Sequence, residues 1–227
     1  MISKLLPRYA IRETMGIVVM GAALFWSAGT FDWWQAWAIL VVTFIWIAAT
    51  AYVILRFHPN LLAERLGPRK GAKSWDSAIM GILGSAQLAR YILAGLDHRH
   101  AWSGAFPLFI QVIALGVCVL GYCLFVWAIA SNAFFSQIVR IQDERGQTVV
   151  SSGPYRYIRH PAYLGAILYE LAAPILLISW WALSVSVLTV FLLILRTGLE
   201  DHALQAELAG YVDFTHQVHY RLFWGIW

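Results

Sequence analysis

The clearest apolar stretch of the chain is residues 33–55, WWQAWAILVVTFIWIAATAYVIL, and this stretch decides the fold class. It contains no acidic or basic side chain, and a helix needs about 20 apolar residues to cross the hydrocarbon core of a bilayer. Hydrophobic residues make up 60% of the whole chain and charged residues only 12%, whereas a soluble domain is about 45–50% apolar and about 25% charged. The composition therefore excludes an ordinary soluble protein or a disordered chain, and it predicts an all-α, polytopic membrane protein.

Further apolar stretches lie on both sides of this segment. Residues 14–29, 77–96 and 106–130 are candidates for further spans, although the second of these carries Gln87 and Arg90. Residues 162–195 are also apolar but are interrupted near Ser179, which leaves two halves of about 16 or 17 residues, or about 25 Å of helix each. Because that length falls short of the bilayer, we expect a transmembrane bundle of four spans followed by a tight C-terminal helical hairpin, marginally spanning or re-entrant.

The basic residues are distributed unevenly along this topology. Of the 16 Lys and Arg residues, all but Arg90 and Arg99 fall in segments that four spans and a hairpin place on one side of the membrane. Positively charged loops face the cytoplasm, so the pattern predicts that both termini are cytoplasmic. It also accounts for the net charge of +4, and we therefore expect no nucleic-acid partner.

Polar and ionisable side chains gather after residue 131. The segment 131–163 reads SNAFFSQIVRIQDERGQTVVSSGPYRYIRHPAY, and glycine and proline break it into loops and turns. We therefore divide one integrated membrane domain into residues 1–130, which supply the four spans, and residues 131–227, which are expected to carry the chemistry.

The triplet Arg159-His160-Pro161 opens the expected hairpin. Proline is favoured at the first helical position, and the free amide donors of a helix start, together with an adjacent arginine, make an anion site. The alternative is that Arg156 and Arg159 are snorkelling anchors at the membrane surface, with His160 a hydrogen-bonded interfacial residue.

Three acidic residues lie in or beside the hairpin. Glu170 falls inside the apolar run, one turn before Pro174, where a carboxylate either lines a wet cavity or is a hydrogen-bonded packing residue. Glu200 and Asp201 follow the expected second half, where they could bind a cation or form a solvated helix exit. Cys118 and Cys123, and the C-terminal histidines, lack the spacing of a disulfide or a metal site, so no metal is expected.

The motif residues of this segment resemble a known family. Gly153-Pro154-Tyr155-Arg156-Tyr157-x-Arg159-His160-Pro161-x-Tyr163-x-Gly165, then Glu200-Asp201, Tyr211 and Tyr220-Arg221, are similar to the isoprenylcysteine carboxyl methyltransferase family, part of a wider group of integral-membrane methyltransferases. The resemblance covers about residues 131–227. It implies that a cytoplasmic C-terminal segment binds S-adenosylmethionine as cofactor and that a lipophilic substrate enters from the bilayer.

Carried over residue by residue, the resemblance implies a set of site residues. The residues expected to bind the cofactor are Arg159, His160, Tyr163, Glu200, Asp201 and Tyr211. Those expected to act on the acceptor are Arg221, Glu170 and Tyr163. The sequence departs from the family pattern at Asp201, where glutamate is usual, at Phe214, where tyrosine is common, and at 223–225, which lack a proline often found there.

The chemistry of the methyl acceptor stays open at this point. A prenylcysteine-type carboxylate is ionised at neutral pH and needs an arginine to hold it, whereas a phospholipid amine or a small thiol needs a base, for which Glu170 and His160 are candidates. The expected partners are a lipophilic small molecule or lipidated substrate and membrane lipid. Outside the enzyme class, the chain could be a non-catalytic sensor or a small-solute carrier, with Arg90 and Glu170 along a polar pathway.

Overall fold

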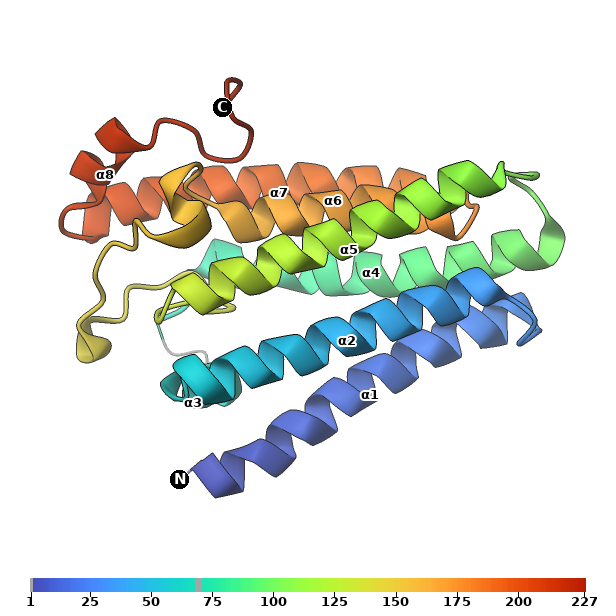
Figure 1. Cartoon of the computed structure of the whole chain (residues 1–227), viewed down its shortest axis with the longest axis horizontal. Coiled ribbons are helices and arrows are strands. Elements are labelled where there is room, and N and C mark those ends of the chain that lie inside the picture. Colours follow the sequence, from blue (N-terminus) through green and yellow to red (C-terminus); the bar gives the residue numbers. More distant parts are fainter. Residues whose placement is uncertain (1, 68–70) are drawn as a thin grey trace.

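The computed structural model describes residues 2–67 and 71–227, and within them every regular element is a helix (Figure 1). The elements, in chain order, are α1 (Ile2–Ala28), α2 (Trp34–Phe57), α3 (Asn60–Leu66), α4 (Ser74–His100), α5 (Leu108–Ser131), the short 3-10 helices η1 (Asp143–Arg145) and η2 (Gly153–Arg156), α6 (Pro161–Leu176), α7 (Trp180–Glu207) and α8 (Tyr211–Gln217). The predicted all-α fold class is confirmed.

Helices α1, α2, α4, α5 and α7 are long and apolar enough to cross a membrane, so the chain is a multi-pass integral membrane protein. α6 has only 16 residues, as expected for a short hairpin arm. The expectation of a second short arm is wrong, because α7 has 28 residues. The helix continues past Leu195 because Thr197 and Asp201, four residues apart, bury one polar face, and the chain turns only near Gly210 in the left-handed conformation (φ 79°).

The helices run side by side along one long axis (Figure 1). α5 packs against α2 and α6, α4 packs against α1 and α7, and α6 packs against α7. The start of α1, the short helix α3, the loop after α5 and helix α8 all lie at the same end of the bundle (Figure 1). The polar segment and the membrane-crossing helices therefore meet at this end.

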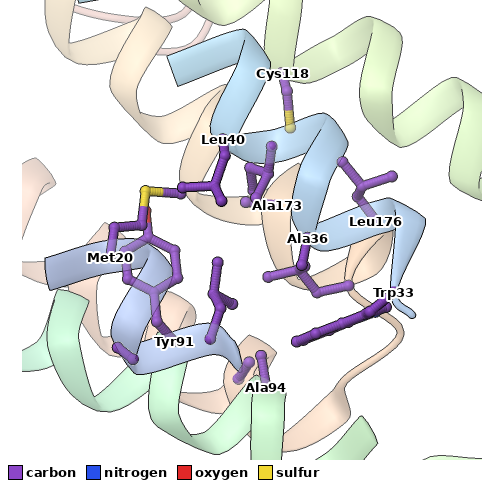
Figure 2. Close-up of a cluster of buried hydrophobic side chains, with 14 of the residues drawn as sticks. Met20, Trp33, Ala36, Leu40, Tyr91, Ala94, Cys118, Ala173 and Leu176 are labelled. Atoms are coloured by element: carbon purple, nitrogen blue, oxygen red, sulfur yellow. The ribbon is translucent and has the colours of Figure 1, made fainter. Parts of the chain in front are cut away.

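The core at the opposite end of the bundle joins six helices through small side chains (Figure 2). Ala36, Ala94 and Ala173 are fully buried there, which lets α2, α4 and α6 approach closely. Trp33 is also buried, and its indole stacks on His98 with ring centroids 4.4 Å apart. This packing fixes that end of the bundle.

Helices α5 and α6 approach each other closely at a pair of glycines. A Cβ atom on Gly121 would lie 2.6 Å from the carbonyl oxygen of Gly165, and one on Gly165 would lie 2.4 Å from the carbonyl oxygen of Gly121. Two backbones can approach this closely only where neither residue has a side chain. The contact sets the position of α6, whose first turn carries the motif residues.

We expect Gly121→Ala to destabilise the fold, because its methyl group meets backbone that cannot move aside. Overpacking of this kind costs about 1–3 kcal/mol, which would appear as a lower midpoint of thermal unfolding in detergent. Gly116 lies on the same helix, and a Cβ atom added there would meet nothing within 4 Å, so Gly116→Ala is the matched control. Equal midpoints for the two variants would contradict the account of the α5–α6 contact.

Candidate active site

A cavity of about 500 Å³ lies at the end of the bundle that carries the polar segment. One wall is apolar and comes from membrane-crossing helices, with Met80, Leu83, Phe125 and Leu193 among its residues. The other wall is polar and comes from the start of α6, the last turns of α7 and helix α8. The loop that follows α5 closes the cavity, since residues 134–142 and 147–150 line it.

The polar wall begins at the first turn of α6. His160 is the residue before the helix and Pro161 is at its first position, as the sequence predicted. The C-terminal segment is paired to this turn, because the amides of Arg159 and His160 donate to the carbonyl oxygens of Tyr220 and Arg221, each over 2.9 Å. The last ten residues therefore hold the motif at the cavity rim.

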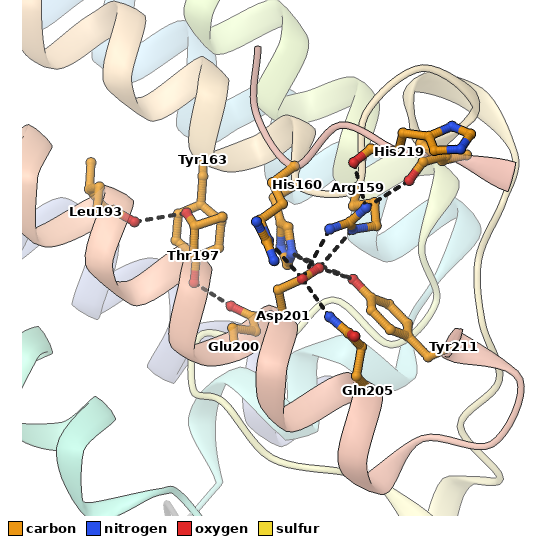
Figure 3. A network of polar contacts seen from close by, with 12 residues as sticks. Arg159, His160, Tyr163, Leu193, Thr197, Glu200, Asp201, Gln205, Tyr211 and His219 are labelled. Carbon is orange, nitrogen blue, oxygen red and sulfur yellow. Dashed lines mark hydrogen bonds and ion pairs between the residues drawn. The ribbon is translucent and has the colours of Figure 1, made fainter. Parts of the chain in front are cut away.

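Asp201 is the centre of the polar network and is fully buried (Figure 3). Side chains of five residues lie within hydrogen-bond distance of its carboxylate: Arg159, His160, Gln205, Tyr211 and Arg221. Arg159 makes two of these contacts, from Nε to Oδ1 at 2.7 Å and from Nη2 to Oδ2 at 3.0 Å. The carboxylate thus fixes groups from α6, α7, α8 and the C-terminal segment at once.

Asp201 and Arg159 are saturated by protein contacts. Besides its bonds to Asp201, Arg159 donates through Nη1 to the carbonyl oxygens of Val218 and His219, at 2.8 Å each. Asp201 does not line the cavity, whereas Arg159 does. Asp201 is therefore placed to position the site, and cofactor contact by Arg159 and Asp201 stays a prediction.

Glu200, one residue before Asp201, points the other way along α7 and lines the cavity. Its carboxylate accepts a hydrogen bond from the Tyr163 hydroxyl of α6 (Figure 3). No arginine, lysine or histidine of the described chain lies within ion-pair distance of it. Glu200 is thus a carboxylate on the cavity wall whose charge the described protein leaves without an ion pair.

The aromatic ring of Tyr163 contacts Arg196, which is itself paired with Asp76. The guanidinium of Arg196 lies 5.3 Å from the centre of the Tyr163 ring, a cation–π arrangement. Arg196 also donates from Nε to Oδ1 of Asp76 at 2.7 Å, and Oδ2 of Asp76 accepts from the Val139 amide at 2.9 Å. This chain of contacts ties the first turn of α4 and the closing loop to Tyr163 and Glu200.

Tyr211 completes the polar wall from α8. Its hydroxyl donates to Oδ1 of Asp201 over 3.1 Å. Burial raises the pKa of this hydroxyl well above its usual value, and the neighbouring Asp201 charge raises it further. Tyr211 is therefore a neutral donor throughout the physiological range. Phe214 packs against it with ring centroids 5.5 Å apart.

The structure separates the predicted site residues into two groups. Those that line the cavity are Arg159, His160, Tyr163, Glu200 and Tyr211. Asp201 and Arg221 lie behind this wall, joined by the 2.8 Å contact from Arg221 Nε to Asp201 Oδ2. Glu170 lies outside the cavity, where its carboxylate pairs with Arg90 in the interior of the bundle.

Glu170 therefore does not reach the site in this structure. The sequence left open whether it lines a cavity or packs in the interior, and the second alternative is the one observed. Arg90 also contacts Tyr91, whose hydroxyl accepts from Nη2 at 3.1 Å. The position of Arg90 in a neighbouring span was the signal for this pairing, because buried ionisable groups in spans are paired with one another.

Sequence reasoning missed the contribution of the first half of the chain. Trp46 of α2, Arg65 of α3, and Met80 and Gln87 of α4 all line the cavity, although the chemistry was expected after residue 131. From the sequence, Arg65 is only a loop cation that sets membrane orientation. Nothing in the local pattern shows that α3 folds back beneath the C-terminal segment.

These features define a class: a multi-pass α-helical membrane protein with a cavity that has one polar and one apolar wall. Residues 112–206 match the sequence model of the isoprenylcysteine carboxyl methyltransferase (ICMT) family. This match confirms the resemblance that the motif residues carry, over the part of the chain that it covers.

The chain is also similar to the solved structure of the eukaryotic intramembrane Ras methyltransferase ICMT. The two share 17% sequence identity with a TM-score of 0.45, over 92% of this chain and 84% of that one. A search of curated proteins found no match.

Proposed function

We propose that this protein transfers a methyl group from S-adenosylmethionine to a lipophilic acceptor, and that the acceptor group is a prenylcysteine-type carboxylate. The observation that carries the proposal is the two-sided cavity. Its polar wall holds the unpaired carboxylate of Glu200, and its apolar wall is built from membrane-crossing helices. A cationic methyl donor and a lipid-like acceptor need these two environments side by side.

The residues of the cavity fit the proposed donor. A volume of about 500 Å³ falls in the range of about 300–1,000 Å³ that small-molecule and cofactor sites occupy. Glu200 offers a carboxylate for an ammonium group or a ribose hydroxyl, and the hydroxyls of Tyr163 and Tyr211 flank it. Bound S-adenosylmethionine would supply a methyl group on a positively charged sulfur. The acceptor would bond to the methyl carbon in line with the breaking carbon–sulfur bond, and S-adenosylhomocysteine would be the leaving group.

The side chains of the chain itself would orient and shield the reactants. Tyr163 donates to Glu200 and fixes the direction of its carboxylate, while Asp201, behind the wall, holds His160 and Tyr211 in place. The apolar wall and the closing loop exclude water, which strengthens electrostatic contacts inside. Alignment of two bound reactants is itself a large contribution to rate.

The proposed choice of acceptor depends on which side chains that could act as a base reach the cavity. A carboxylate acceptor is ionised at neutral pH and needs positioning only. A phospholipid amine or a small thiol would need a base; His160 is on the wall, but Glu170 is paired with Arg90 and distant from it. The same pairing favours an enzyme over a carrier, since the two residues expected to mark a polar pathway neutralise each other.

We further propose that the cavity end of the bundle faces the cytoplasm, with both termini on that side. The start of α1, helix α3 and helix α8 lie together at this end (Figure 1), and they adjoin the segments that carry most of the basic residues. The positive-inside rule supports this orientation, and residues 131–227 would then present the donor site to the cytosol.

We expect Glu200→Gln to weaken binding of S-adenosylhomocysteine by about tenfold or more, since a hydrogen bond to a charged group contributes about 1.5–3 kcal/mol. Isothermal titration calorimetry of the purified protein measures this directly. His202→Ala is the matched control, because His202 lies on the same helix but is exposed. An unchanged dissociation constant for Glu200→Gln would remove Glu200 from the donor site.

Transfer itself is tested by incubating the parent protein with methyl-labelled S-adenosylmethionine and three acceptors: an S-farnesylcysteine derivative, phosphatidylethanolamine and a small aliphatic thiol. We expect label in the first as a base-labile methyl ester. Label found only in the amine or the thiol would support S-adenosylmethionine as the methyl donor but would contradict a carboxylate acceptor.

A further inference from the structure

The cations on the cavity wall differ in whether the described protein supplies a carboxylate to pair with them. Four of them pair with carboxylates of the protein: Lys73 with Glu207, Arg140 with Glu64, Arg159 with Asp201, and Arg196 with Asp76. Arg65 also lines the cavity, but no carboxylate of the described residues lies within ion-pair distance of it. Charged groups that leave water are normally paired, so Arg65 is the wall cation whose counter-charge the described protein does not supply.

The surroundings of Arg65 are aromatic. Its guanidinium lies 5.8 Å from the centre of the Phe135 ring, and its Nε is buried with no hydrogen-bond partner in the part of the chain that is described. Glu13 lies near enough for its charge to act on Arg65 but is itself bound by Arg12. Burial lowers the pKa of Arg65, and the neighbouring Tyr9 hydroxyl and the Glu13 charge offset only part of this effect.

A second donor without a partner lines the same cavity. The Nε1 of Trp46 is buried and, among the described residues, meets no acceptor. The indole is held firmly, because it stacks on Tyr122 with centroids 4.6 Å apart and meets the edge of Phe125 at 5.4 Å. Phe125 in turn contacts Phe135, with centroids 5.5 Å apart. A continuous aromatic wall therefore connects Trp46 to the side chain under Arg65.

We propose that Arg65 and Trp46 form the subsite for the anionic head of the lipophilic acceptor, with the Arg65 guanidinium bound to the anionic oxygens and the Trp46 N–H to a neighbouring oxygen. This inference rests on the proposed function and assigns the acceptor side of the same cavity. The cavity wall then holds two charges that have no ion pair among the described residues, Glu200 for the cationic donor and Arg65 for the anionic acceptor. The aromatic wall between Trp46 and Arg65 suits the chain that carries the head group.

The shared chemistry of the ligand is an anionic oxygen group on an apolar chain. Two sources offer it: the carboxylate of a prenylated cysteine and the phosphate of an anionic phospholipid. A carboxylate is itself the nucleophile of the proposed reaction, so contact with Arg65 would hold the reacting group. Arg65 is in that case a residue that touches substrate and does not take up a proton.

The test compares two probes that differ only in charge, N-acetyl-S-farnesylcysteine and its carboxamide. Their dissociation constants are measured by calorimetry on the full chain in nanodiscs of zwitterionic lipid, with S-adenosylhomocysteine present. We expect the parent to bind the carboxylate about tenfold to a hundredfold more tightly than the amide, and Arg65→Met to bring the two within about twofold. Arg56→Met, an exposed arginine at the end of α2, is the control that keeps the difference.

Binding of S-adenosylhomocysteine to Arg65→Met alone separates this inference from the proposed function. We expect that affinity to stay within about twofold of the parent, which also shows that the variant is folded. A parallel loss of it would place Arg65 at the donor and overturn the assignment, as would a carboxylate preference that survives in Arg65→Met. Failure of the parent to bind S-adenosylhomocysteine would instead count against the proposed function.

Two further arms complete the test. Trp46→Phe keeps the ring but not the N–H, and we expect it to weaken the carboxylate probe by about threefold to tenfold; no change would remove Trp46 from the subsite. Adding phosphatidylglycerol to the nanodiscs should leave the carboxylate affinity of the parent unchanged. If phosphatidylglycerol weakened binding of the carboxylate probe to the parent but not to Arg65→Met, the subsite would belong to a phospholipid phosphate. That result would overturn its assignment to the acceptor carboxylate.

Discussion

Asp201→Asn should abolish binding of S-adenosylhomocysteine and lower the thermal stability of the protein together. The substitution keeps the shape of the side chain but removes the charge that Arg159 and Arg221 share. It also places an amide donor where only donors converge. Breaking a buried ion pair by removing one partner costs about 3–5 kcal/mol, and here the same carboxylate also positions His160 and Tyr211.

The measurement for Asp201 is paired, with calorimetry for binding and the midpoint of thermal unfolding for stability. Asp213→Asn is the control, because Asp213 lies nearby on α8 but is exposed and makes no side-chain hydrogen bond or ion pair in the described structure. Glu200→Gln should weaken binding with little change in the midpoint, since its side chain has no ion pair to lose. If Asp201→Asn behaved like Asp213→Asn, the carboxylate would not be the centre of the network.

Glu170→Gln should produce the second large effect, and this one should fall on stability. Arg90 is fully buried between α4, α6 and α7, and Glu170 supplies the carboxylate it pairs with. Removing that charge leaves an uncompensated guanidinium in the interior of the bundle, which costs about 3–5 kcal/mol. We expect a markedly lower unfolding midpoint in detergent.

The double variant Arg90→Met/Glu170→Leu is the informative companion. Replacing a buried pair by apolar residues of similar volume is often neutral or stabilising, so we expect the double variant to recover most of the lost stability. It should also keep its affinity for S-adenosylhomocysteine, since neither residue lines the cavity. Loss of that affinity in a folded double variant would return Glu170 to the site.

Composition and span length were sufficient to predict the membrane bundle. Residues 33–55 form α2 almost as expected, because a long apolar run in a bilayer can satisfy its backbone only as a helix. The length of α7 was not predictable in the same way. Its polar end is helical because Thr197 and Asp201 are buried by α6, α8 and the C-terminal segment, and those contacts come from distant parts of the chain.

The site was predicted in part for a related reason. His160, Tyr163 and Glu200 lie on the cavity wall because the start of α6 and the end of α7 are neighbours, which a hairpin already implies. The distinction between Glu200 and Asp201 depends on helix rotation, since adjacent residues point about 100° apart. Arg65 and Trp46 came from no motif, and only the packing of α2 and α3 brings them to the cavity.

The most direct test of the account is a cryo-electron microscopy structure of the full chain in a nanodisc with S-adenosylhomocysteine. The account predicts ligand density in the cavity between α6, α7 and α8, with its amino group or ribose at the Glu200 carboxylate and the aromatic wall at Trp46 and Phe135 left free for the acceptor. Density at any other surface, with this cavity filled by side chains, would contradict it.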